Sequence, residues 1–169
     1  MSLVLVALLL STLPLRAGDV PGQAQLLENG AYGTALTDRI KGAKRRIICA
    51  FYLFRTGKSA GNRPRAVAAE LIAASRRGVE VTVILEGGKP VGTENRATAR
   101  LLSQGGVRVL FPTRRVTTHA KAVSIDDRYA LIGSHNLTQS ALLHNNELSV
   151  MLDSPPLAAK VRGYLEQLK

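Results

Sequence analysis

Apolar runs alternate with helix-forming segments through the first two thirds of the chain, and this order constrains the fold more than any other feature. Three short apolar runs are typical of buried strands: 47–54, 79–85 and 107–110. Two segments with apolar residues at helical spacing lie between them: 64–78 and 94–104. A strand–helix–strand–helix–strand order favours parallel neighbouring strands with helices packed on the sheet. The sequence therefore predicts an α/β fold.

The remaining segments complete this prediction at both ends of the chain. Three further short strands are expected at 120–125, 129–132 and 147–152, the first two joined in a hairpin by the turn 126–128. Helices are expected at 24–41 and 157–168. A chain of 169 residues suits a single domain. We therefore expect one mixed, largely parallel β-sheet flanked by helices.

The N-terminal segment resembles an export signal. Residues 3–10 are apolar and no charged residue precedes Arg16, but the apolar run is too short for an ordinary membrane-spanning helix. We expect residues 1–17 to be a signal peptide or an N-terminal membrane anchor, and residues 18–169 to be the functional domain. Either alternative predicts an exported protein, periplasmic or secreted.

The charge of the chain favours polyanionic partners. Lys and Arg number 23 against 12 Asp and Glu, which gives a formal net charge of +11. Such a charge promotes encounter with nucleic acid and with anionic lipid headgroups. Charge alone does not separate these two partners.

A group of polar residues in the C-terminal third has the chemistry of a phosphate site. His119 and Lys121 are two residues apart at the start of a predicted strand, so an imidazole and an ammonium can face one ligand. The imidazole can attack phosphorus, and the ammonium can stabilise the negative charge that develops. Ser134 and Asn136 have the same spacing after the next strand and offer neutral hydrogen-bond donors.

Two carboxylates accompany this group. Glu147 begins the strand at 147–152, where it can accept the second N–H of the histidine and fix its tautomer. Asp126 lies seven residues after His119 and therefore on the opposite face of a regular strand. It is a candidate catalytic residue and, at least equally, a candidate for a structural role in the turn.

These residues resemble the signature of the phospholipase D superfamily. His119-x-Lys121 followed by four residues and Asp126 is similar to its HxKxxxxD motif, and Gly133-Ser134-x-Asn136 with Glu147 is similar to the continuation. The resemblance implies a phosphodiesterase that forms a phosphohistidine without a metal ion or other cofactor. It is nearest to the short, exported bacterial endonucleases that have one such motif.

A single motif also implies an assembly. The mechanism needs a second group, ideally another histidine, to protonate the leaving oxygen. Short members of the superfamily pair two motifs by dimerising, so the resemblance implies a phospholipase D-like half-domain that forms a homodimer around two copies of His119.

The expected substrate is nucleic acid, DNA and possibly RNA, cut with little sequence preference. Arg114 and Arg115 lie just ahead of His119 and are the candidate substrate-contacting pair. A phospholipid headgroup is the alternative substrate, for a hydrolase or transferase that associates with membranes through its N-terminus. His135 and His144 match no common metal-binding spacing with His119.

Overall fold

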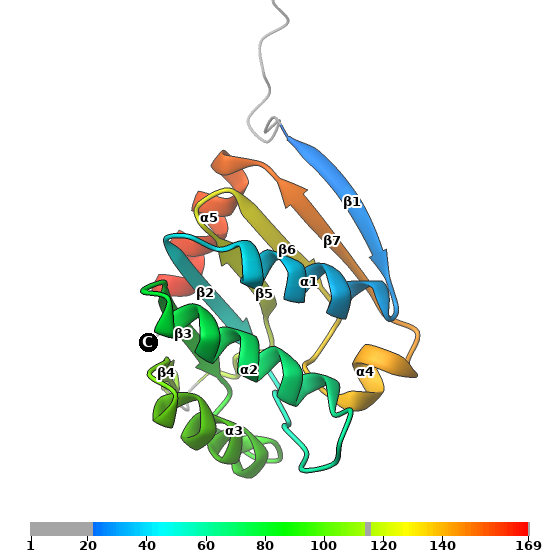
Figure 1. Ribbon diagram of the computed structural model, residues 1–169, viewed down its shortest axis with the longest axis vertical. Coiled ribbons are helices and arrows are strands. Elements are labelled where there is room, and N and C mark those ends of the chain that lie inside the picture. The colour runs from blue at the N-terminus through cyan, green and yellow to red at the C-terminus, as the bar shows by residue number, and fades with distance from the viewer. Residues whose placement is uncertain (1–21, 114–115, 169) are drawn as a thin grey trace, which may run out of the picture.

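The computed structural model describes residues 22–113 and 116–168 as one seven-stranded sheet between helices (Figure 1). In chain order the elements are β1 (Gln23–Glu28), α1 (Ala31–Gly42), β2 (Arg46–Phe51), α2 (Arg63–Arg76), β3 (Glu80–Leu85), α3 (Gly92–Gln104), β4 (Arg108–Leu110), β5 (Lys121–Ile125), β6 (Tyr129–Gly133), α4 (Gln139–Leu143), β7 (Leu148–Asp153) and α5 (Pro155–Glu166). The strand order is β1-β7-β6-β5-β2-β3-β4. The predicted leader, residues 1–17, lies outside the described residues.

The strands β2, β3 and β4 form the parallel part of the sheet. The helices α2 and α3 connect them, as the alternation in the sequence predicts. Asn62 caps α2 by accepting a hydrogen bond from the Arg65 N–H at 2.9 Å, and Gly78 leaves the helix with a φ of +89°. The expected α/β class is confirmed in this region.

The rest of the sheet is antiparallel, so parallel pairing is less extensive than we predicted. β5 pairs antiparallel with β2, and the series β5-β6-β7-β1 continues antiparallel to the edge of the sheet. The reason is connectivity: a three-residue turn joins β5 to β6, and such a short turn can join only antiparallel neighbours. The sheet is mixed, but parallel pairs are confined to one side of it.

The first strand corrects the prediction of a helix over 24–41. The helix begins only at Ala31, and Gln23–Glu28 form the edge strand β1, paired with β7 from Gln23↔Asp153 to Glu28↔Leu148. Leu27 is the one residue of β1 that is buried, so the strand has almost no apolar pattern of its own. Pairing with β7 therefore determines its conformation.

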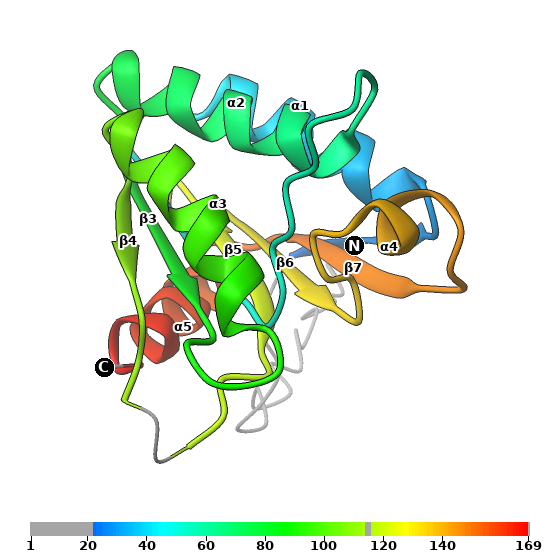
Figure 2. The same cartoon turned by 90° about the horizontal axis from the view of Figure 1, so that it is seen from below.

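Helices cover the two faces of the sheet unequally. The larger core lies between the sheet and α1, α2 and α3, with Phe51, Leu71 and Leu102 among its buried residues. Of the helices that the structure describes, α5 alone lies on the opposite face, as Figure 2 shows, where Leu165 packs on Ile48 and Ala122 in a smaller core. One helix is about 10 Å wide and strands are about 4.8 Å apart, so α5 leaves much of a seven-stranded face uncovered.

No helix in the described ranges is long and apolar enough to cross a membrane.

Candidate active site

The predicted residues meet at one edge of the sheet. β2, β3 and β6 end at this edge, and β5 and β7 begin there, because β5 is antiparallel to β2 and β7 is antiparallel to β6. A hollow of about 790 Å³ opens at this edge and extends along the face that carries α5. It is lined by polar residues of the predicted site, His119, Lys121, Ser134 and Asn136. The structure therefore brings together four residues that were singled out from the sequence.

His119 and Lys121 are in direct contact. The Lys121 Nζ lies 3.1 Å from each ring nitrogen of His119 and 2.9 Å from the His119 carbonyl oxygen. An ammonium only donates hydrogen bonds, so a ring nitrogen that accepts one from it carries no proton. His119 itself is exposed and lies in the loop before β5. The arrangement presents an accessible imidazole with a fixed positive charge beside it.

Burial of Lys121 affects the pKa of its ammonium. Its side chain begins β5 and the residue is only 8% exposed. Burial lowers the pKa of the Lys121 ammonium below its usual value, although the nearby Glu147 carboxylate acts in the opposite direction. An incoming phosphate would add a further negative charge beside this ammonium.

The amide of Asn136 has a defined orientation. Its Oδ1 accepts a hydrogen bond from the Leu53 backbone N–H at 3.2 Å, just after β2. The next residue, Leu137, forms a parallel bridge with Phe54, which fixes the main chain on either side of this bond. With Oδ1 engaged, the Nδ2 group is the part of the amide that remains to donate to a ligand.

Ser134 and Glu147 bind each other rather than His119. The Ser134 hydroxyl donates a short hydrogen bond to Glu147 Oε2, and the Asn145 Nδ2 donates to Glu147 Oε1 at 3.0 Å. Within the described part of the chain, no hydrogen bond joins Glu147 to His119. Ser134 and Asn145 each bind one carboxylate oxygen, and the orientation of the imidazole by Glu147 stays a prediction.

These contacts also set the charge of Glu147. Partial burial raises the pKa of this carboxyl, but the hydrogen bonds from Ser134 and Asn145 and the positive charge of Lys121 outweigh it. The net effect is a pKa below the usual value. Glu147 is therefore a negative charge near the phosphate-binding groups.

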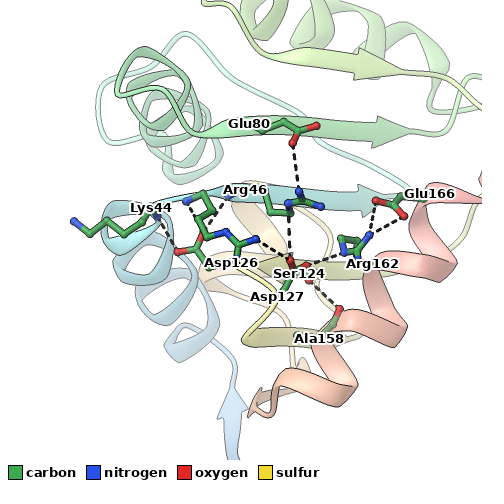
Figure 3. A network of polar contacts seen from close by, with 10 residues as sticks. Lys44, Arg46, Glu80, Ser124, Asp126, Asp127, Ala158, Arg162 and Glu166 are labelled. Atoms are coloured by element: carbon green, nitrogen blue, oxygen red, sulfur yellow. Dashed lines mark hydrogen bonds and ion pairs between the residues drawn. The ribbon is translucent and has the colours of Figure 1, made fainter.

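Asp126 lies at the other end of β5 from the site, which favours the structural role in the turn over the catalytic one. Its carboxylate accepts the backbone N–H groups of Lys44, Arg45 and Arg46 at 2.8, 2.8 and 3.0 Å (Figure 3). It lies five positions along the strand from Lys121, a span of roughly 17 Å. Asp126 holds the start of β2 against the β5–β6 turn, where its φ is +56°.

His135 is fully buried and has a packing role. Its ring stacks on Tyr32 with centroids 4.3 Å apart. Nε2 lies 2.9 Å from the Asn29 carbonyl oxygen and must donate to it, so Nδ1 accepts from the Ser149 hydroxyl at 2.7 Å. Burial lowers the pKa of His135, which is opposed by the bond to Asn29 and by Glu147.

Three residues of the site region were missed from the sequence. The ring of Tyr52 packs on the His119 ring with centroids 4.7 Å apart. Glu86 accepts the backbone N–H of Thr118, and Asn95 binds the main chain at the ends of β2 and β3. Position alone offered a signal: Glu86 directly follows the predicted strand 79–85, and Tyr52 lies near the end of the predicted strand 47–54, where parallel strands bring functional groups together.

The predicted substrate-contacting pair, Arg114 and Arg115, lies outside the described residues and stays a prediction. Among the residues that the structure describes, no group of three or more His, Cys, Asp or Glu side chains is placed to hold a metal ion.

Sequence comparison finds similarity to a family model and to two curated proteins. A family model described as "Cardiolipin synthase, PLD-like domain" matches residues 36–169. Cardiolipin synthase B of Escherichia coli (strain K12) is 40% identical over 83 residues, which are 47% of this chain and 20% of that protein. Cardiolipin synthase B of Salmonella typhi is 34% identical over 97 residues, 55% of this chain and 23% of that protein. These matches thus span about a fifth of the length of the relatives.

Structural comparison finds two chains of similar size and one longer chain. Nuc from Salmonella typhimurium, a phospholipase D family member, superposes with a TM-score of 0.76 at 21% identity, covering 88% of this chain and 94% of Nuc. NucT from Helicobacter pylori gives a TM-score of 0.69 at 18% identity and covers 88% and 96%. Phosphatidylserine synthase of Haemophilus influenzae Rd KW20 gives 0.68 at 16% identity, covering 89% of this chain and 40% of that one. At these identities the likeness establishes the fold.

Proposed function

The chain belongs to the phospholipase D-like family, and from this premise we propose that it is a metal-independent endonuclease whose nucleophile is His119. The observation that carries the proposal is the convergence of His119, Lys121, Ser134 and Asn136 on one hollow. The imidazole provides a nucleophile, and the ammonium and the amide provide donors for the oxygens of a phosphodiester.

The reaction proceeds in two steps. A ring nitrogen of His119 attacks phosphorus, a P–N bond forms, and the P–O bond to the leaving group breaks. Lys121 Nζ and Asn136 Nδ2 stabilise the oxygens as charge gathers on them. The leaving oxygen takes a proton from a second imidazole, which then accepts a proton from the water that attacks the phosphohistidine and breaks the P–N bond.

A second copy of the chain supplies that imidazole in our proposal. The described part of one chain contains one such His-x-Lys pair, whereas the reaction needs two histidines. The face that carries α5 leaves apolar side chains exposed beside the site, Ile132 at 40% and Tyr164 at 55%. Pairing of two such faces would bury these residues and place two His119 rings near one two-fold axis.

Nucleic acid is the substrate that size and charge favour. The net charge of +11 suits a backbone of repeating phosphates. The chain also covers nearly the whole length of the short proteins Nuc and NucT. Recognition through phosphates predicts weak sequence preference and binding that weakens steeply with salt.

A phospholipid is the second candidate substrate, because curated relatives at 34–40% identity are cardiolipin synthases. In that case the same histidine would receive a phosphatidyl group and pass it to water or an alcohol. The covalent step is common to both candidates, so only the substrate distinguishes them.

A substrate panel tests the proposal. Purified protein is assayed with excess chelator on single-stranded DNA, double-stranded DNA, RNA and phospholipid vesicles, beside the His119→Ala variant. We expect nuclease activity that survives chelation and disappears in His119→Ala. Loss of activity in chelator contradicts the metal-free mechanism, and turnover of the vesicles alone transfers the proposal to the lipid.

Mixed dimers test the assembly. Wild-type protein is unfolded and refolded with increasing proportions of His119→Ala, and sedimentation establishes the oligomeric state. If each site needs two histidines, activity falls with the square of the wild-type fraction. A linear fall, or an active monomer, would refute the shared site.

A further inference from the structure

Glu86 has an unusual environment for a carboxylate. It follows β3 directly and is only 7% exposed. The residues that the structure describes include no Lys or Arg in an ion pair with it. A buried carboxylate is costly unless its oxygens are hydrogen-bonded, so its partners indicate why it is there.

Those partners are two backbone N–H groups from separate segments. Gly88 donates to Oε1 at 2.5 Å, and Thr118 donates to Oε2 at 2.6 Å. A Cβ atom at position 88 would lie 2.8 Å from Oε1, so glycine permits this close approach. Thr118 is buried and lies in a loop, and its amide is one residue from His119.

The main chain of Glu86 is itself fixed. Its carbonyl oxygen accepts a hydrogen bond from Asn95 Nδ2 at 2.8 Å, and the same amide group donates to the Tyr52 carbonyl at 2.7 Å. Asn95 is fully buried on α3. A rigid connection therefore runs from α3 through Glu86 to the loop that holds His119, and through Tyr52 to the His119 ring.

We propose that Glu86 is the positioning residue of the nucleophile: its two carboxylate oxygens hold the Gly88 and Thr118 amides and so place His119 in the phosphate site. The inference rests on the proposed function, because it concerns the group that attacks phosphorus. Both oxygens are needed as acceptors. A glutamine would offer one acceptor and one NH₂ group, which would oppose one of the two amides.

Glu86→Gln tests the proposal, with Glu70→Gln as the matched control. Glu70 lies on α2, where it pairs with Lys41 at 4.0 Å, far from the candidate site. For Glu86→Gln we expect kcat on a small phosphodiester to fall about 10- to 100-fold while KM changes less than about twofold, since displacement of the nucleophile by about 1 Å has effects of this order. Unchanged kcat in a folded Glu86→Gln protein would overturn the proposal.

Two measurements on the resting protein make the test independent of activity. The NMR signals of the His119 ring should move in Glu86→Gln and stay in place in Glu70→Gln. In the unmodified protein the Thr118 amide should exchange slowly with solvent although it is in a loop, and fast exchange there would refute the bond even if Glu86→Gln does not fold. Should the wild type have no phosphodiesterase activity, the proposed function fails while these measurements still report on the placement of His119.

Discussion

Leu53 and Asn136 are 83 positions apart in the chain, yet the Leu53 backbone N–H donates to Asn136 Oδ1 at 3.2 Å. The bond crosses from the end of β2 to the segment after β6. It assigns the two ends of the Asn136 amide, with oxygen on the protein and nitrogen available to the ligand. The orientation of a catalytic donor is thus set by a residue outside the motif.

Asn136→Asp should inactivate the protein while preserving the fold. The new carboxylate can still accept from Leu53, but it presents a negative oxygen to the phosphate where Asn136 presents N–H groups. We expect kcat/KM to fall by about 100-fold or more, as for loss of a transition-state donor. Gln104→Glu, the same amide-to-acid change at the end of α3, should have little effect. Similar losses in both variants would point to charge rather than to the site.

Lys121 should give the pH profile an alkaline limb. Because burial lowers the pKa of its ammonium, the group loses its proton at a lower pH than an exposed lysine, whose pKa is about 10.4. Binding of the phosphate needs the charged form, so kcat/KM should decline as pH rises through this lowered pKa. Lys121→Arg keeps its charge and should lose the limb, although its activity is lower. A limb at the same pH in both proteins would assign it to another group.

Asp126→Asn should affect stability more than catalysis. The substitution weakens the bonds to three backbone amides at the start of β2, and we expect the free energy of unfolding to fall by about 1–3 kcal/mol. Urea unfolding measures this loss. Since the site is at the other end of β5, the activity per folded molecule should stay within about threefold. A large loss of kcat in fully folded protein would restore Asp126 as a catalytic candidate.

His135 should make the fold sensitive to mild acid. Burial lowers the pKa of His135 in the folded state below the unfolded value of about 6.5. Between these two values the unfolded chain binds a proton and the folded chain does not, so stability falls as pH decreases through this window and levels off below it. The slope is at most about 1.4 kcal/mol per pH unit. His135→Gln should be less stable at pH 8 but should lose this slope in urea titrations, and parallel curves would contradict the assignment.

The fold could be predicted where its signal is local. The alternation of apolar runs and helical segments gave β2, α2, β3, α3 and β4, because each of these elements buries a recognisable face. β1 and α4 were missed for the opposite reason: β1 buries only Leu27, and α4 has five residues. Edge pairing with β7 determines β1, and the paired residues lie 120 to 130 positions apart in the chain.

The site residues could likewise be predicted where the signal is local, and not where it depends on contacts between distant segments. Spacing within the motif placed His119, Lys121, Ser134 and Asn136 around one hollow, because residues two apart share a face of extended chain. The partner of Glu147 was not predictable, since it depends on where β6 ends relative to β7. Tyr52, Glu86 and Asn95 come from segments that meet the motif only through the order of strands in the sheet.

The position of Asp126 changes what the signature HxKxxxxD records. The His and Lys of the signature are the reactive residues at the beginning of β5. The Asp follows the end of that strand and is hydrogen-bonded to the start of β2. The four intervening positions therefore measure the length of a strand. A homologue with one residue inserted between Lys121 and Asp126 would keep every reactive group. We expect the insertion to disturb the pairing register of β5 with β2 rather than to remove a catalytic residue.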